Sequence, residues 1–332
     1  MREPAFWWRN PGLAAALLNP FGLAYGAIAA RRMTKTGTEV GVPVLCVGNF
    51  TVGGAGKTPT AMMLAQMLAD AGERPFCLSR GYGGNIAAPK LVDAHADSAA
   101  QVGDETLLLA RVAPTIVARD RVAGAKLARA QGASVIIMDD GLQNPSLAKG
   151  FRLAVIDARR GIGNGCNFPA GPLRAPMATQ LACVDALLIV GEGAAADNIA
   201  AEGRTRGLRI FRGQLAPDAA AVATLTGHDV LAFAGIGDPE KFFATALAAG
   251  IPVKARKSFP DHHRYTAEDA GELIMQAERD SLRLLTTEKD RTRFAGDDAL
   301  AALATRTHTL PVTMVLEEPE ELRRLVMSKL RR

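Results

Sequence analysis

The segment TVGGAGKT, residues 51–58, has the residue types and spacing of a phosphate-binding loop. An apolar run precedes it and an amphipathic helical pattern follows, which predicts a strand, a loop and a helix. Glycines let backbone N–H groups turn toward phosphate oxygens, and the helix N-terminus favours negative charge. Lys57 can reach the β- and γ-phosphates of a nucleotide, and the Thr58 hydroxyl can ligate Mg²⁺. The expected nucleotide-binding residues are Thr51, Val52, Gly53, Gly54, Ala55, Gly56, Lys57 and Thr58.

One position of this loop departs from the strict P-loop pattern. Thr51 stands where a glycine, six residues before the lysine, is usual. Pro59 falls in the first helical turn, where proline is tolerated, so the context still favours a P-loop over a glycine-rich turn that contains Lys-Thr by chance. We therefore expect a bound nucleoside triphosphate, with ATP and Mg²⁺ as cofactors.

Two adjacent carboxylates follow a second apolar run. SVIIMDDGLQN, residues 134–144, places Asp139 and Asp140 at the carboxyl edge of an expected strand. Open α/β sheets bind ligands at this edge. The alternative is a simple strand-ending turn, because Asp-Gly is a common turn pair. Beside a P-loop we favour support of the magnesium ion by these two carboxylates, directly or through water.

The elements that must position these residues follow an alternating pattern. Short apolar runs recur along the chain, and helical patterns separate several of them, which predicts a mostly parallel sheet covered on both faces. The pattern restarts near residue 215, and a chain of 332 residues suits two domains. The expected fold is α/β: a P-loop NTPase core, a smaller C-terminal α/β domain and an N-terminal membrane-associated helix. The expected boundaries are 1–35, 36–214 and 215–332.

The amino-acid composition limits the kinds of partner that we expect the protein to bind. The net charge of +5 suits an anionic partner. However, the chain has no long Lys/Arg block and only three tyrosines for stacking on bases, so we expect no nucleic-acid partner. The four cysteines show no C-x-x-C spacing, which argues against a zinc site or a disulfide framework.

The N-terminal segment, residues 1–32, is apolar between two groups of arginines. A membrane-spanning helix, a signal peptide and a helix packed on the protein's own core are all alternatives. Asn19-Pro20 interrupts the apolar run, which counts against the first two. We favour an interfacial anchor, with the rings of Phe6, Trp7 and Trp8 in the headgroup layer and arginines near anionic lipid.

Eight motifs occur in the same order as in a known family. The chain resembles the tetraacyldisaccharide 4'-kinases, the lipid A 4'-kinases of Gram-negative bacteria. The motifs are NFTVGGAGKTP (49–59), SRGYGG (79–84), VGDE (102–105), DDGLQ (139–143), PAGPLR (169–174), FAGIGDPEKF (233–242), FPDHHRYT (259–266) and TTEKD (286–290).

The resemblance implies transfer of the ATP γ-phosphate to the 4'-hydroxyl of an acylated glucosamine disaccharide 1-phosphate. The site would be the cytoplasmic face of the bacterial inner membrane, with a peripheral or monotopic protein in contact with its lipids. The base of the family is an aspartate that works with a histidine, and the motifs place these at Asp104 and at Asp261-His262. A positioned carboxylate can take the proton of a sugar hydroxyl as it attacks phosphorus.

Simpler interpretations exist for each of these residues. Asp104 precedes a helical pattern and could N-cap it. His262 and His263 could be an inert surface pair. Arg80 and Arg174 are expected to bind substrate phosphates in a bidentate manner, although each could be solvated surface charge. The family commonly has an acidic residue at Ala175 and a histidine at Asn144.

Two other functions fit a P-loop. One is a switch ATPase of the deviant Walker type, but such proteins carry a lysine where this chain has Val52. The other is a soluble kinase of a small metabolite, which leaves the apolar N-terminus unexplained.

Overall fold

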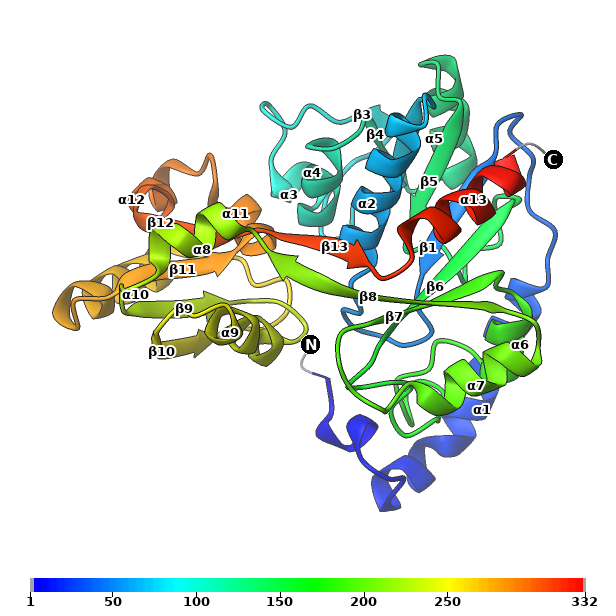
Figure 1. Cartoon of the computed structure of the whole chain (residues 1–332), viewed down its shortest axis with the longest axis horizontal. Helices are drawn as coiled ribbons and strands as arrows, with labels where there is room; N and C mark the ends of the chain where they lie inside the picture. The colour runs from blue at the N-terminus through cyan, green and yellow to red at the C-terminus, as the bar shows by residue number, and fades with distance from the viewer. Residues whose placement is uncertain (1–2, 331–332) are drawn as a thin grey trace.

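The computed structural model describes residues 3–330, and in this range the strands form two sheets (Figure 1). The larger has nine strands, in the order β13-β8-β7-β6-β1-β5-β2-β4-β3. Its pairings are parallel except those of β8 with β13 and of β3 with β4. The expected α/β fold with a mostly parallel sheet is confirmed. The strands are β1 (Val44–Gly48), β2 (Pro75–Ser79), β3 (Lys90–Leu91), β4 (Thr115–Val117), β5 (Val135–Asp139), β6 (Phe151–Asp157), β7 (Ala186–Val190), β8 (Arg209–Pro217) and β13 (Val312–Leu316).

Helices cover both faces of the large sheet, which explains why its central strands are apolar along their whole length. On one face, Leu64 and Leu68 of α2 pack in the same cluster as Leu322 and Val326 of α13. On the other face the cover comes from α5, α6 and α7. The helices beside this sheet are α1 (Leu13–Met33), α2 (Lys57–Asp70), α3 (Ala99–Val102), α4 (Asp104–Ala110), α5 (Arg121–Ala130), α6 (Met177–Ala182), α7 (Asp197–Thr205) and α13 (Pro319–Leu330).

The smaller sheet has four parallel strands in the order β10-β9-β11-β12. Because they are parallel, their carboxyl ends meet at one edge, and the segments that follow β9, β10 and β11 lie together there. Its elements are α8 (Ala219–Leu225), β9 (Val230–Ala234), α9 (Pro239–Ala248), β10 (Val253–Ser258), α10 (Ala267–Arg279), β11 (Arg283–Thr287), α11 (Glu288–Phe294), a 3₁₀ turn (Asp298–Leu300), α12 (Ala301–Arg306) and β12 (Thr307–Leu310).

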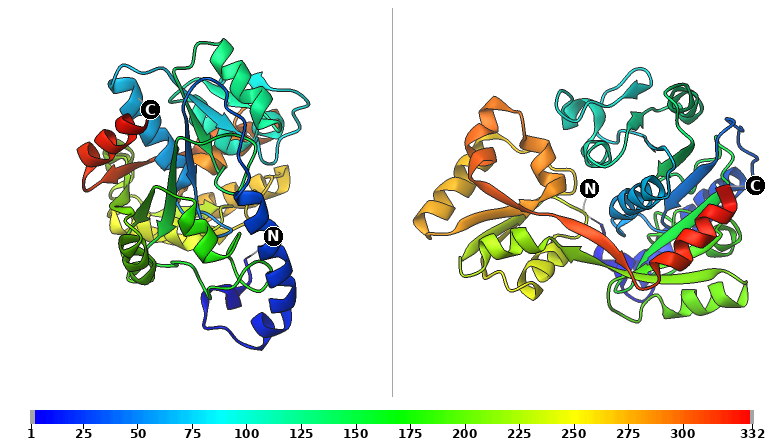
Figure 2. Two further views of the ribbon diagram at one scale, coloured as in Figure 1. Left: turned by 90° about the vertical axis from the view of Figure 1, so that its right-hand side faces the viewer. Right: turned by 45° about the horizontal axis from the view of Figure 1, so that its top comes forward.

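The nine-residue strand β8 and the shorter strand β13 form an antiparallel pair, and through them the chain passes between the two sheets (Figures 1 and 2). The chain leaves the large sheet along β8, builds the small sheet and returns along β13. The expected division at about residue 215 puts residues 312–330 with the small sheet, whereas β13 and α13 belong to the large one. We therefore propose that the C-terminal domain comprises residues 218–311 and that residues 312–330 belong to the P-loop domain.

The N-terminus forms a 3₁₀ turn (Ala5–Trp8) and the helix α1, which lies at one end of the molecule (Figure 1). The helix is continuous through Pro20, although the sequence predicts an interruption there. A proline removes a single donor from a helix of 21 residues. Gly22 and Gly26 face the 167–176 loop so closely that a Cβ on Gly26 would lie 2.3 Å from the Asn167 amide.

One aromatic ring differs from its predicted place. The Trp7 side chain is 4% exposed and donates a hydrogen bond from Nε1 to the Pro169 carbonyl, 3.0 Å away. The Phe168 ring meets it edge to face. Trp7 therefore fills the protein interior and does not reach a headgroup layer. This packing joins residues 162 positions apart in the chain, which no local pattern shows.

Candidate active site

The P-loop follows β1 and leads directly into α2. Gly53 and Gly56 have φ values of +107° and +94°, a conformation that side chains disfavour, so the glycines are needed to turn the loop. Lys57 Nζ lies 3.2 Å from the Gly53 carbonyl oxygen, folded back over the loop. Parallel pairing aligns Val47 of β1 with Asp139 of β5. The loop after β1 therefore lies beside the carboxylates at the end of β5.

Asp139 and Asp140 have different surroundings. Asp139 is 3% exposed, and its Oδ2 accepts a hydrogen bond from Thr58 Oγ1 at 3.1 Å. Burial, with the nearby charges of Glu105 and Asp140, raises the pKa of Asp139 above its usual range. Burial also acts to raise the pKa of Asp140, but the positive charges of Arg174 and Lys57 outweigh it and lower that pKa to about 2.

Arg174 connects the acidic edge to the P-loop. Its guanidinium contacts both oxygens of Asp140, at 2.7 and 3.1 Å, and its Nε donates to the Thr51 carbonyl at 2.9 Å. Such a bidentate pair is strong and directional. Asp140 has a φ of +51°, in the left-handed region that aspartate tolerates better than most residues with a side chain.

Asp104 begins α4 beside the large sheet, His262 lies in the loop after β10 of the small sheet, and the two side chains are in contact. His262 Nδ1 lies 3.1 Å from Asp104 Oδ2. Asp104 is the first residue of α4 and follows Gly103, so Gly103 is the N-cap residue, while Asp104 Oδ1 accepts from the Glu105 N–H at 2.8 Å. The Tyr82 ring packs against the His262 ring, with centroids 4.8 Å apart.

The Asp104 carboxylate is ionised despite its burial. Only 4% of the residue is exposed, which acts to raise its pKa. The hydrogen bond from His262 and the charges of Lys289 and Arg293 outweigh burial, so the pKa of Asp104 falls well below its usual range. Lys289 Nζ also contacts Glu105 Oε1 at 2.9 Å.

Sequence reasoning missed three of these residues. Glu105 and Lys289 lie inside two of the family motifs, VGDE and TTEKD, but the sequence around each gives no sign that the two side chains contact one another. Arg293 lies just beyond the second motif. Because the contacts join helices about 180 residues apart, the three were detectable from the sequence only as charged residues next to a motif.

Of the other residues considered for the site, Asp261 contacts His262, whereas His263 and Arg80 do not contact Asp104. Asp261 Oδ1 accepts from the His262 N–H at 3.0 Å, and its Oδ2 lies 3.8 Å from His262 Nε2. His263 contacts Asp269 Oδ2 at 2.9 Å and stacks on a phenylalanine, away from Asp104. Arg80 is exposed, and the described residues offer it no hydrogen bond.

The two positions that depart from the family pattern have local roles. Ala175 is fully buried, and its carbonyl accepts a hydrogen bond from Gln180. Asn144 Oδ1 accepts from the N–H and hydroxyl of Ser146, which closes the turn after the acidic edge. The Asn144 side chain therefore takes part in a turn, whereas Ala175 contributes only its backbone carbonyl.

The oxygen donors at the acidic edge fit Mg²⁺. Asp139 Oδ1 is buried and has no hydrogen-bond partner among residues 3–330. Mg²⁺ prefers oxygen ligands and usually binds through one or two carboxylates plus substrate phosphates. The described residues contain no group of three His, Cys, Asp or Glu side chains that could hold a metal alone. A magnesium ion held by Asp139 and Thr58 would therefore also need oxygen ligands from the phosphates.

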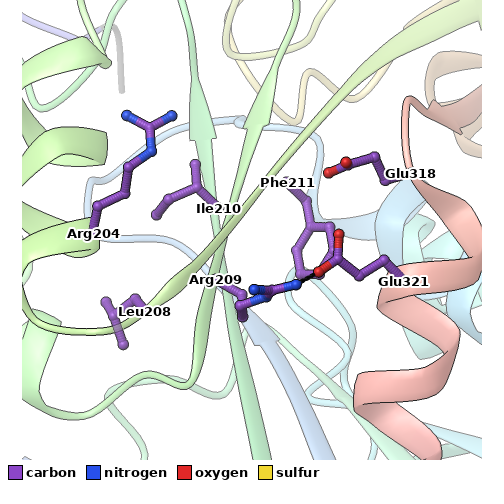
Figure 3. Close-up of a pocket in the computed structure, with 7 residues that line it drawn as sticks. All are labelled: Arg204, Leu208, Arg209, Ile210, Phe211, Glu318 and Glu321. Atoms are coloured by element: carbon purple, nitrogen blue, oxygen red, sulfur yellow. Dashed lines mark ion pairs between the residues drawn. The ribbon is translucent and has the colours of Figure 1, made fainter.

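A separate surface pocket lies between α7, β8 and α13 (Figure 3). Arg209 and Glu321 form an ion pair across it. None of the residues predicted for the phosphate site lines this pocket.

A P-loop that leads from a strand into a helix beside an acidic strand edge is typical of the P-loop NTPases, and here an aspartate–histidine pair lies where this fold meets a second sheet. The sequence model of the LpxK family, described as tetraacyldisaccharide-1-P 4'-kinase, matches residues 14–331. The chain belongs to this family and is accordingly a kinase.

Relatives and a solved structure agree with this assignment. A tetraacyldisaccharide 4'-kinase of Rhodopseudomonas palustris (strain BisB5) is 56% identical over 330 residues, which cover 99% of this chain and 97% of the relative. One of Nitrobacter hamburgensis is 52% identical over 332 residues, 100% of this chain and 99% of the relative. The crystal structure of LpxK from Aquifex aeolicus in complex with ATP superposes with a TM-score of 0.70 at 26% identity, covering 96% of this chain and 100% of that one.

Proposed function

We propose that this protein transfers the γ-phosphate of ATP to the 4'-hydroxyl of a tetraacyldisaccharide 1-phosphate in lipid A biosynthesis. Membership of the kinase family supports the reaction. The observation that carries the assignment of the site is the Asp104–His262 contact across the two sheets. The loop that carries Asp261 and His262 also lies near the P-loop. Gly237, in the loop after β9, is between them: a Cβ added to it would be 3.5 Å from both Asp261 Oδ2 and the Gly54 nitrogen.

The nucleotide's phosphates are proposed to lie in the loop of residues 51–58, with Lys57 turned outward from the Gly53 carbonyl to the β- and γ-phosphates. Thr58, Asp139 and Asp140 would hold Mg²⁺, with Asp139 Oδ1 as the carboxylate oxygen free to bind it. When bound, the ion neutralises charge on the transferring phosphoryl group.

Asp104 is proposed as the base. Its Oδ2 is occupied by His262 and Arg293, whereas Oδ1 accepts one hydrogen bond, from the Glu105 N–H, within the described chain. Oδ1 therefore has a lone pair available for the proton of the sugar hydroxyl. A low pKa keeps this oxygen unprotonated at neutral pH. A weak base suffices because the transition state of phosphoryl transfer is loose.

His262 and three other residues support this reaction. His262 donates from Nδ1 to Asp104, and Asp261 receives the backbone N–H of the same histidine, which fixes the loop. Arg174 holds Asp140 against the P-loop. Arg80, which is exposed beside the Tyr82 loop, is free to contact a phosphate of the acceptor.

We propose that α1 places the site at the cytoplasmic face of the inner membrane. The helix is long and apolar enough to cross a membrane, yet it packs on the protein through its small residues. Its bulky side chains are outside: Leu13, Leu17, Phe21, Leu23 and Ile28 are each more than 60% exposed. Such an apolar surface suits a monotopic anchor in the lipid interface.

Replacement of two exposed residues tests the anchor. The double variant Leu17→Ser/Phe21→Ser is expected to bind anionic liposomes at least ~5-fold more weakly, because less apolar surface enters the lipid. Co-sedimentation measures the binding, and nucleotide affinity should not change. Met275→Ser removes an equally exposed apolar side chain from α10 and should leave binding as it is. Equal binding by the double variant would remove α1 from the anchoring role.

The proposed reaction is tested with the acceptor and an analogue that lacks the 4'-hydroxyl. Wild-type protein with ATP and Mg²⁺ in mixed micelles is expected to add one phosphate to the disaccharide lipid, detected by mass spectrometry. The 4'-deoxy analogue should gain none. Phosphorylation of the deoxy analogue would show that another hydroxyl is the acceptor.

A further inference from the structure

Helix α11 presents two cations to the first turn of α4. Thr287 N-caps α11, and the helical spacing puts Lys289 and Arg293 on one face, four residues apart. Lys289 contacts Glu105, and Arg293 Nε donates to Asp104 Oδ2 at 2.7 Å. Neighbouring acidic residues on α4 thus each receive a cation from the small sheet.

The guanidinium of Arg293 is held from behind. Its side chain is 6% exposed, and one terminal nitrogen contacts both the Gly235 carbonyl and Asp290 Oδ1. Asp290 is fully buried and also accepts hydrogen bonds from the Gly235 N–H and the Tyr265 hydroxyl. The other terminal nitrogen lies 2.6 Å from Asp104 Oδ2 as an ion pair, while the hydrogen bond to this oxygen comes from Nε. The network sets the position of the guanidinium before any substrate binds.

We propose that Arg293 is a positioning residue for phosphoryl transfer, which fixes the Asp104 carboxylate so that Oδ1 is the oxygen left to receive the proton. This inference rests on the proposed function. A planar guanidinium suits the task because it binds Asp104 and the Gly235 carbonyl at once, which an ammonium group cannot do in the same geometry. Because Arg293 lies on α11, which follows β11 of the small sheet, the Asp104 carboxylate has this partner only when the small sheet packs against α4.

The charges around Asp104 set the direction of a pH effect. Arg293 and Lys289 face it from α11, His262 from the loop after β10, and Glu105 adjoins it on α4. Arg293 favours the ionised carboxylate. Its loss leaves fewer cations to oppose burial and the Glu105 charge, so protonation becomes easier and the base is lost at a higher pH.

The experiment compares the pH profiles of kcat/KM for wild-type protein and Arg293→Met, with the disaccharide lipid as acceptor. We expect kcat to fall at least ~10-fold in Arg293→Met and the acidic limb of the profile to move up by about one pH unit or more. The KM for ATP should stay within about twofold, because Arg293 has no contact with the P-loop. Added guanidinium ion should restore part of the activity of the variant. Such a rescue is not expected if Arg293 has only a structural role.

Arg291→Met is the matched control, since Arg291 lies on the same helix but packs over the Phe294 ring. It should match wild type in kcat and profile. If Arg293→Met does not fold, as judged by thermal unfolding, Arg293→Gln carries the same predictions with an amide that can still donate hydrogen bonds. If the wild type is active and a folded Arg293 variant keeps the kcat and the pH profile of the wild type, only this inference is overturned. A wild type that phosphorylates no lipid would overturn the proposed function instead.

Discussion

Lys57→Met is expected to lower kcat by at least ~10²-fold, the usual scale for removal of a positioned charge at a developing negative charge. Methionine keeps most of the length of the unbranched side chain and the helix start, but it has no cation to place at the phosphates. Steady-state kinetics of phosphate transfer to the disaccharide lipid measures the effect, and ATP affinity is measured separately by equilibrium binding.

The matched control for Lys57 is Lys126→Met, which removes an exposed lysine from α5. Its turnover should equal that of the wild type. Turnover of Lys57→Met within threefold of wild type would show that the 51–58 loop does not hold the transferred phosphate.

Asp104→Asn is expected to lower kcat by about 10²- to 10⁴-fold, the usual contribution of a general base. The amide occupies the same space but cannot accept a proton from the sugar hydroxyl. The change also leaves Arg293 and Lys289 without the buried charge they face, so the melting temperature should fall as well. Activity is therefore measured well below the melting temperature of the variant.

Asp280→Asn serves as the control for Asp104, because Asp280 pairs with Arg279 at the exposed end of α10. It should leave both turnover and stability unchanged. Normal turnover by a folded Asp104→Asn protein would take this residue out of the base role and leave His262 as the candidate.

The P-loop and the acidic edge could be predicted because local sequence carries both. The strand, the glycine-rich turn and the helix are contiguous in residues 44–70, and parallel pairing brings the end of β5 to the same edge. The α/β class followed from apolar runs covered on both faces. The motif order also indicated the family, which the comparisons confirm.

The rest depends on contacts between distant segments. Arg293 and Asp104 are 189 residues apart, and a charged residue on a short helix looks the same whether it is solvated or buried against a carboxylate. The return of β13 to the large sheet is a matter of strand partners, and an isolated apolar strand does not show which sheet it joins. Trp7 resembles an interfacial aromatic until the carbonyl that receives its N–H is known.

The central claim is that ATP bound by residues 51–58 passes its terminal phosphate to a glycolipid. The most direct test is a single-turnover reaction of the full chain with ATP labelled at the γ-phosphorus, in mixed micelles that contain the tetraacyldisaccharide 1-phosphate. We predict that the label appears in the lipid, and that without the lipid it stays in ATP. Label released as inorganic phosphate, with none in the lipid, would contradict the account and favour a switch ATPase.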